Sequence, residues 1–192
     1  MPTPIPFTEW APDTATTAGA QYEAKGVLSR GKKYVPLPDL NKIHPNAVIN
    51  DRCLGAWGGY ATNKSTYVFA GDNQRLYRVA GGIPSDVSRA TQYSITDQSA
   101  WSFAQFGNNI IAAALGAGKL QRFQMGTSSA FADIDGSPTE NAVVFRIRQQ
   151  MFACYQSTVN VSALNDITDW TPATATQAFQ STTPTELGNI VA

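Results

Sequence analysis

Charged side chains are scarce in this chain. Only 15% of its 192 residues are Asp, Glu, Lys or Arg, and fourteen acidic and fourteen basic residues give a formal net charge of zero. A balanced charge excludes general electrostatic attraction to nucleic acid or to an anionic membrane surface, and it lowers the solubility of a free monomer. The composition, with 43% hydrophobic residues, favours a folded chain that works inside an assembly.

Cysteine and histidine are nearly absent. Cys53 and Cys154 lie about a hundred residues apart without a CxxC pair, which excludes a metal framework held by Cys and His. We expect both thiols to be small buried side chains. The GAGKL run at 116–120 lacks the Ser or Thr that follows the lysine of a phosphate-binding loop, so nucleotide binding is excluded and no cofactor is expected.

Long apolar runs are also missing. No stretch approaches the roughly eighteen apolar residues that a membrane-spanning helix needs, so we expect no membrane segment. The first residues, MPTPIPFTEWAPD, have neither a basic region nor an apolar core of signal-peptide length. We therefore expect the chain to be made in a cytosolic compartment.

A helical apolar stripe is the last absence. From residue 47 onward, short apolar runs alternate with turns rich in Gly, Asn, Asp or Ser. The stretch 141–173, NAVVFRIRQQMFACYQSTVNVSALNDITDWTPA, predicts strands over 143–147, 151–155 and 159–163, followed by a polar turn that Trp170 closes. The sequence therefore predicts an all-β protein.

A repeat of about 41 residues organises these strands. Aligning the strand taken to enter each sheet, in YVFAGD, IIAAAL and MFACYQ, places Phe69, Ile111 and Phe152 at intervals of 42 and 41 residues. Short antiparallel strands at a spacing of about 40 to 45 residues are typical of β-propeller blades, and a β-sandwich is the alternative fold. Residues 47–192 supply about three and a half such units, so we expect a β-propeller-like domain that is incomplete at its C-terminus.

Residues 1–46 are predicted to form an extended Pro-rich N-terminal arm and connector before the domain at 47–192. The first 22 residues carry four prolines and little periodicity. Phe7 and Trp10 are large apolar side chains in this arm, and each would lose about 2 kcal/mol if left in water. We expect them to anchor the arm, either on its own domain or on a neighbour.

A basic segment follows the arm. Lys25, Arg30, Lys32 and Lys33 occur there with no acidic residue among them. One interpretation is a solvated hairpin with Gly31 in its turn. The alternative is a basic patch that faces a partner or passing double-stranded DNA.

The turn at the end of 141–173 contains Asn165, Asp166, Asp169 and Trp170. Two neighbouring carboxylates are also the groups that glycoside hydrolysis or calcium binding requires. Asn and Asp in such turns ordinarily hydrogen-bond to local backbone amides. We therefore interpret these residues as a structural turn that closes a blade, and we expect no catalytic and no metal-binding residue.

Several stretches resemble virion proteins of tailed bacteriophages. PFTEWAPD followed by YEAKGVLSRGKKYVPLPDL resembles the opening of these proteins. WSFAQFGNNIIAA and VNVSALNDITDWTPA are similar to a blade pattern of the family, in which a Trp-x-Phe-x-x-Phe-Gly strand precedes a Ser-x-x-Asn-Asp-x-x-x-Trp turn. The resemblance covers most of the chain in short islands that keep the family's order. It implies a structural β-propeller protein of the head-to-tail junction or tail nozzle, and no catalytic residue.

Three functions of different classes follow from these observations. The first is a non-enzymatic virion component, a ring-forming nozzle or head-to-tail connector subunit that contributes to the DNA conduit and is assembled in the host cytoplasm. Its expected partners are copies of itself, the portal or adaptor, and other tail proteins. The alternatives are a receptor- or glycan-binding propeller at the tail tip and a glycoside hydrolase.

Overall fold

A computed structural model describes residues 27–30, 33–36, 48–96 and 98–183. The chain divides into two compact units, Met1–Lys42 and Ile43–Ala192. The described part of the first unit is a hairpin in which β1 (Val27–Arg30) pairs antiparallel with β2 (Lys33–Pro36). This pairing confirms the predicted hairpin, although its turn lies outside the described residues. The predicted domain boundary between residues 46 and 47 stays a prediction.

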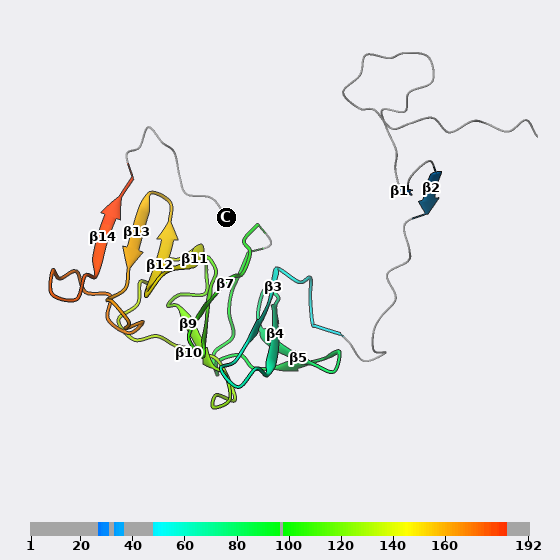
Figure 1. Cartoon of the computed structure of the whole chain (residues 1–192), viewed down its shortest axis with the longest axis horizontal. Helices are drawn as coiled ribbons and strands as arrows, with labels where there is room; N and C mark the ends of the chain where they lie inside the picture. Colours follow the sequence, from blue (N-terminus) through cyan, green and yellow to red (C-terminus); the bar gives the residue numbers. More distant parts are fainter. Residues whose placement is uncertain (1–26, 31–32, 37–47, 97, 184–192) are drawn as a thin grey trace, which may run out of the picture. The chain divides into compact units, whose positions relative to one another are not determined.

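The second unit contains three four-stranded antiparallel sheets, each built from one contiguous stretch of chain (Figure 1). Sheet I consists of β3 (Gly55–Tyr60), β4 (Thr66–Gly71), β5 (Leu76–Ala80) and β6 (Ile83–Asp86). Sheet II consists of β7 (Ser102–Phe106), β8 (Asn109–Ala113), β9 (Gln121–Gln124) and β10 (Ala132–Asp133). Sheet III consists of β11 (Val143–Ile147), β12 (Gln150–Tyr155), β13 (Thr158–Val161) and β14 (Phe179–Thr182). The described residues form no helix, which confirms the all-β prediction.

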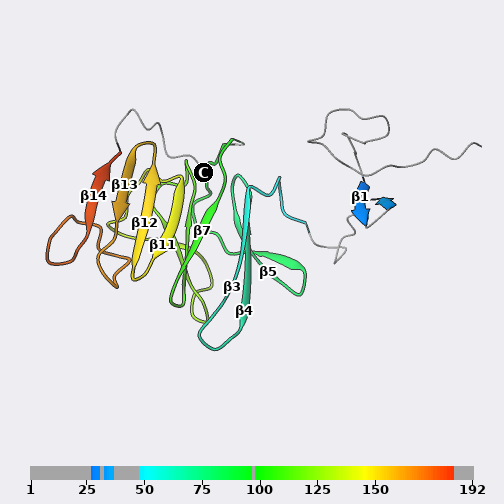
Figure 2. The same ribbon diagram turned by 45° about the horizontal axis from the view of Figure 1, so that its top comes forward.

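The three sheets share one topology. In each of them, strands that follow one another in the sequence lie side by side. Figures 1 and 2 show the first strands of the three sheets, β3, β7 and β11, next to one another. The later strands of sheets I and III lie farther from this central group of strands. A sandwich packs two sheets face to face, whereas this unit has three in succession.

The repeat has the predicted spacing but a different place in the sheet. Phe69, Ile111 and Phe152 lie on β4, β8 and β12, each the second strand of its sheet, so the prediction that they lie on the entering strand is wrong. The entering strand of sheet I is GAWGGY, whose three glycines are typical of a turn. A turn-like composition therefore concealed β3.

Sheet II lies between the other two sheets. One core cluster contains Phe69 of sheet I with Ile110 and Ala112 of β8, and a second contains Ile111 of β8 with Met151 of sheet III. Successive residues of a strand point to opposite faces, so both faces of β8 are buried. This explains why β8 is apolar without interruption after Asn109, whereas buried and exposed residues alternate over most of β4.

Aromatic side chains fill the core between sheets I and II. Phe69 is fully buried, and its ring meets those of Phe123 and Phe131 edge-on at centroid distances of 5.0 and 5.4 Å. Such edge-to-face pairs contribute about 0.5–1.5 kcal/mol beyond the burial of area. In the described part of the chain, no helix is long and apolar enough to cross a membrane.

Candidate functional site

Hydrogen bonds connect the first strands of neighbouring sheets near the points where these strands begin. The backbone amide of Trp101, just before β7, donates to the carbonyl oxygen of Leu54, just before β3, at 2.9 Å. The hydroxyl of Ser102 on β7 donates to the carbonyl oxygen of Val144 on β11 at 3.1 Å and accepts from the Val144 amide at 3.0 Å. Equivalent points of successive sheets are therefore tied together along the inner side of the fan.

Trp101 occupies space that two glycines leave open. Gly55 and Gly71 lie opposite each other on β3 and β4. A Cβ atom at Gly71 would lie 2.6 Å from Nε1 of Trp101, and one at Gly55 would lie 2.5 Å from the Trp101 carbonyl oxygen. The indole is 5% exposed, and its Nε1 donates to the carbonyl oxygen of Asp72 at 2.8 Å. Gly71 is thus required by the close approach of the indole ring that seals sheets I and II, and Gly55 by the close approach of the Trp101 backbone.

The turn after β13 uses its carboxylates locally. Oδ1 of Asp166 accepts hydrogen bonds from the amide and the hydroxyl of Thr168 at 2.8 and 2.7 Å. These two hydrogen bonds hold the pKa of the Asp166 carboxyl below its usual value. Oδ1 of Asp169 accepts from the amide of Thr171 at 3.0 Å. Both carboxylates therefore stabilise the turn as Asp side chains commonly do.

Asn165 and Trp170 complete this turn. Asn165 has a left-handed φ of 60°, which Asn tolerates, and its amide donates to the carbonyl oxygen of Gln149 at 2.8 Å. Trp170 is 7% exposed, packs in the cluster between sheets II and III, and donates from Nε1 to the carbonyl oxygen of Ile167 at 2.8 Å. The structure thus brings the four predicted residues together in one turn whose contacts satisfy backbone groups and fill the core.

A groove of about 390 Å³ opens beside this turn, between sheet III and the loop before it. Its lining combines the rings of Tyr155 and Trp170 with the carboxylate of Glu140 and the amides of Asn160 and Gln180. Flat rings and nearby amides are groups that can bind sugars. Among the described residues that line the groove, Glu140 is the single carboxylate, whereas glycoside hydrolysis uses two.

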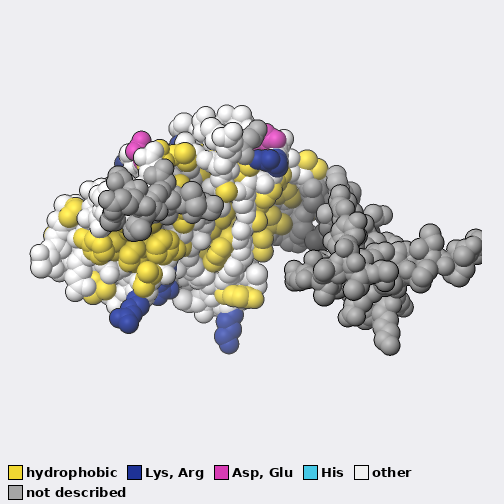
Figure 3. Space-filling view, turned by 90° about the horizontal axis from the view of Figure 1, so that it is seen from above, with side chains coloured by type: hydrophobic (Ala, Val, Ile, Leu, Met, Phe, Trp, Pro, Cys, Tyr) yellow, Lys and Arg dark blue, Asp and Glu magenta, His cyan; other side chains and the backbone are white. Residues whose placement is uncertain are grey.

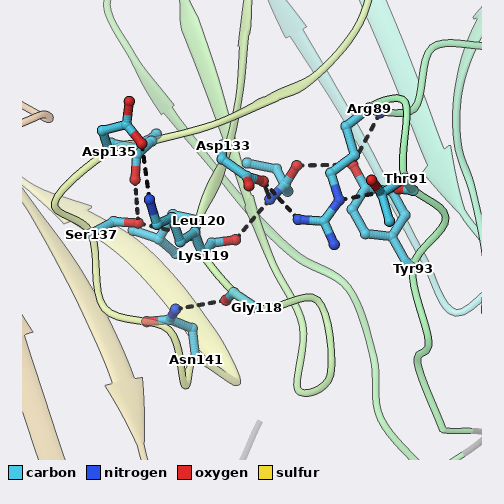
Figure 4. Close-up of polar contacts among 12 residues, drawn as sticks. Arg89, Thr91, Tyr93, Gly118, Lys119, Leu120, Asp133, Asp135, Ser137 and Asn141 are labelled. Carbon is cyan, nitrogen blue, oxygen red and sulfur yellow. Dashed lines mark hydrogen bonds and ion pairs between the residues drawn. The ribbon is translucent and has the colours of Figure 1, made fainter.

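A polar network crosses the outer part of sheet II (Figure 4). Arg89, which follows β6, donates from Nη1 to Oδ1 of Asp133 on β10 at 2.7 Å, and Nε2 of Gln121 donates to the same oxygen at 2.7 Å. The hydroxyl of Tyr93 donates to Oε1 of Gln121 at 3.0 Å. Burial acts to raise the pKa of Asp133, but the hydrogen bonds from Gln121 and Arg89 outweigh it and the pKa is lowered. Burial raises the pKa of the Tyr93 phenol. The network fastens the end of sheet I to sheet II.

Sheet III presents an apolar face on the side away from sheet II. Met151 and Ala153 of β12 pack toward sheet II, so Phe152 between them points the other way. The strand register aligns one row of residues with Phe152 across all four strands: Phe145, Phe152, Val161 and Phe179. Phe145 and Phe179 are 37% and 46% exposed, whereas Val161 between Phe152 and Phe179 is fully buried, and Figure 3 shows hydrophobic side chains gathered over the end of the molecule that holds sheet III. We call this surface the open face of sheet III.

Sheet I has a corresponding open face. Phe69 of β4 packs toward sheet II, so its neighbours Val68 and Ala70 point away from it. One row across the four strands of this face consists of Gly58, Val68, Val79 and Pro84. Val68 is 37% exposed, and Ala70 is half-buried. The same face also carries Tyr77, which lies opposite Ala70 and is buried, and the exposed ring of Tyr60, so its side chains are of mixed size.

The two cysteines differ in environment. Cys154 is buried on β12, and burial raises the pKa of its thiol. Cys53 is exposed, so the prediction that both thiols are buried is wrong. It lies in the loop before β3, where its Sγ donates to the carbonyl oxygen of Gly55 at 3.2 Å. Within the described ranges, no three His, Cys, Asp or Glu side chains gather as a metal site requires.

The remaining predicted residues belong to the N-terminal part. The proposed arm anchors Phe7 and Trp10 lie outside the described residues, as do Lys25 and Lys32. The backbones of Arg30 and Lys33 form the last pair of the β1–β2 hairpin. The basic patch and the arm anchors stay predictions.

No protein-family model matches the chain, and no curated protein matches it.

Proposed function

We propose that this chain is a structural, non-enzymatic component of a phage virion. In this proposal it is a ring-forming tail nozzle or head-to-tail connector subunit, whose β-propeller-like blades contribute to the DNA conduit. The observation that carries the proposal is the succession of three four-stranded meanders with one topology, stacked face to face. Propellers consist of such sheets repeated around a channel, with the sheets covering one another's faces.

The contacts of the polar side chains support a structural role. Asp133 joins an ion pair at the outer part of sheet II, Asp166 accepts hydrogen bonds within its own turn, and Ser102 ties β7 to β11. Each of these groups holds a strand or a turn in place. Lowered carboxyl pKa values, as at Asp133 and Asp166, are the opposite of what a general acid requires at neutral pH.

The charge of the chain supports a conduit rather than a DNA-binding protein. Affinity for double-stranded DNA comes largely from Lys and Arg side chains that displace counterions from phosphates. With a formal net charge of zero, the chain has no excess of such side chains. A conduit has to let DNA pass without retaining it, and a neutral subunit meets this requirement.

Incorporation into particles tests the proposal. In purified virions of the phage that encodes it, quantitative mass spectrometry is expected to find the chain in a fixed copy number relative to the portal. Phage whose gene carries an early stop codon are expected to yield non-infectious particles. Absence of the chain from purified virions, or normal infectivity without the gene, contradicts the proposal.

The groove beside Trp170 favours a second candidate function, the binding of a saccharide by a propeller at the tail tip. Tyr155 and Glu140 contribute a ring and a carboxylate to its lining. On a glycan array, binding that is lost in both Tyr155→Ala and Glu140→Gln supports this second function. If the wild-type chain binds no glycan, the second function is contradicted and the structural proposal is the one that remains.

A further inference from the structure

Sheets II and III each turn one row of polar residues toward the sheet before them. The row contains Gln121 and Asp133 in sheet II, and Asn160 and Gln180 in sheet III. Both rows continue outward from an alanine of the second strand that is fully buried against the preceding sheet. Asn160 and Gln180 therefore hold the places that Gln121 and Asp133 hold one repeat earlier.

The row of sheet II is covered by side chains from the connection that precedes the sheet, residues 87–101 (Figure 4). The hydroxyl of Tyr93 donates to Oε1 of Gln121 at 3.0 Å, and Nη1 of Arg89 donates to Oδ1 of Asp133 at 2.7 Å. The guanidinium carbon of Arg89 lies 4.7 Å from the centre of the Tyr93 ring. A guanidinium stacked on a phenol ring thus fills the outer part of the seam between sheets I and II.

The row of sheet III lines an open groove. The connection that precedes this sheet, residues 134–142, is shorter than the one before sheet II. Asn160 and Gln180 line the groove of about 390 Å³ beside Trp170. The groove therefore lies, one repeat later, in the place that a guanidinium and a phenol ring fill between sheets I and II.

The lining of the groove suits a planar cation. It contains the ring of Tyr155 and the carboxylate of Glu140, and the described residues that line it include neither Lys nor Arg. Nε2 of Gln180 donates to Oδ1 of Asn160 at 3.0 Å, and Oε1 of Gln180 can accept a hydrogen bond. A guanidinium carries five N–H donors, pairs with carboxylates and stacks on aromatic rings, so this lining offers each kind of partner that it needs.

The wall that carries the carboxylate is fixed by hydrogen bonds to sheet II and within its own loop (Figure 4). Nδ2 of Asn141 donates to the carbonyl oxygens of Gly118 and Pro138 at 3.3 and 2.6 Å. The hydroxyl of Ser137 accepts a hydrogen bond from the Leu120 amide at 3.1 Å. A preformed wall lowers the entropy that binding costs.

We infer that the groove between sheets II and III binds an arginine side chain of a partner protein. The guanidinium pairs with Glu140 and stacks on Tyr155, as Arg89 pairs with Asp133 and stacks on Tyr93 in the preceding seam. In a second copy of this chain, Arg89 and Tyr93 are engaged in their own seam, so the partner is a different protein. The inference rests on the comparison of the two seams and not on the proposed virion role, and it competes with saccharide binding for the same groove.

An NMR titration of the full ¹⁵N-labelled chain tests the inference. The probe is a blocked peptide with the sequence of residues 89–93, Arg-Ala-Thr-Gln-Tyr, which carries the cation and the ring of the filled seam. Saturable shifts are expected for the side-chain amides of Asn160 and Gln180. Replacing the arginine of the peptide by alanine is expected to weaken binding by about 10-fold or more, and lysine at that place is expected to give an intermediate affinity.

Variants of the chain locate the site. Glu140→Gln removes the charge and keeps the size, and it is expected to raise the dissociation constant of the arginine peptide by about 3- to 10-fold. Asp135→Asn is the matched control, because it makes the same change on the same connection at a side chain that is 96% exposed and does not line the groove. Tyr155→Leu is expected to weaken binding, whereas Tyr155→Phe keeps the ring and the affinity. Circular dichroism shows whether each variant is folded.

Four results would overturn the inference. The first is equal or non-saturable binding of the arginine and alanine peptides, and the second is equal affinity for the arginine and lysine peptides, which would show a response to charge alone. The third is a glycan that shifts the same amides and that the arginine peptide does not displace. The fourth is self-association that Glu140→Gln abolishes, because it would place a second copy in the groove. Virion incorporation is measured separately, so the proposed function has its own experiment.

Discussion

Replacing Gly71 by alanine tests the seam between sheets I and II most directly. The new Cβ would lie 2.6 Å from Nε1 of Trp101 and 2.9 Å from Cδ2 of Leu76, so the indole has to move. Overpacking of this kind costs about 1–3 kcal/mol, whereas a Gly→Ala change at an unstrained site gains about 0.4–1 kcal/mol. For a unit of about 150 residues, the expected loss lowers the melting temperature by roughly 2–12 °C.

The assay is urea unfolding of Gly71→Ala, Trp101→Ala and the double variant at one protein concentration. Trp101→Ala alone is expected to cost about 3–5 kcal/mol, because it removes a buried ring. In the Trp101→Ala background only Cδ2 of Leu76 stays close to the added Cβ, and the space left by the indole lets it shift, so Gly71→Ala is expected to cost less than in the wild-type chain and the cycle to show a coupling of up to about 3 kcal/mol.

Gly58→Ala is the matched control, because it lies in the neighbouring strand and its nearest atom to a new Cβ, the Tyr67 carbonyl oxygen, is 4.0 Å away. It is expected to leave the free energy of unfolding unchanged or slightly raised. Equal losses for Gly58→Ala and Gly71→Ala, or an additive cycle with Trp101→Ala, would refute the idea that the indole requires the glycine.

Three further predictions concern the polar groups. Asp166→Ala is expected to lose about 1 kcal/mol in urea unfolding, because two donors of Thr168 lose their acceptor; an unchanged midpoint contradicts this role. Because the pKa of Asp133 is lowered in the folded chain, its ionised carboxylate stabilises the fold above the ordinary carboxyl pKa of about 4, and this stabilisation is lost as the pH falls through the folded-state pKa. Asp133→Asn is therefore expected to reduce the fall of the urea unfolding midpoint at acid pH. Ellman's reagent is expected to label Cys53 rapidly in the folded chain and Cys154 only after unfolding, and equal rates would contradict their different burial.

The all-β fold could be predicted because the signs of a strand, short apolar runs bounded by polar turn residues, are local features of the sequence. Residues 143–147 were predicted as a strand and form β11, and residues 151–155 fall within β12. The antiparallel pairing of β3 with β4, of β7 with β8 and of β11 with β12 follows from the short turns between them, whereas residues 162–178 between β13 and β14 are too long a connection to indicate that pairing. The glycine-rich β3 escaped this reasoning, because Gly55 is set by the close approach of the distant Trp101 backbone and Gly59 by the ring of Trp57, and neither is a matter of strand propensity.

The chemistry of the turn could be predicted better than the open faces. Asn165, Asp166 and Asp169 act within a few residues of their own position, so local sequence indicates their hydrogen bonds. Exposure of Phe145 depends on which sheet lies opposite, and that is not a property of β11 alone. The sequence does contain a sign of it, because Val143, Val144 and Phe145 form a continuous apolar run of the kind seen in β8, which is buried on both faces.

The contiguity of each sheet has a consequence for the order of folding. Every strand pair of sheet I lies within residues 55–86, so all its hydrogen-bonded ladders can form before residue 102 leaves the ribosome. Loops this short have a low entropy of closure, and proteins dominated by local contacts fold quickly. Each later sheet then docks on a finished template, so the chain is expected to fold from its N-terminal sheet onward, with stability growing one sheet at a time.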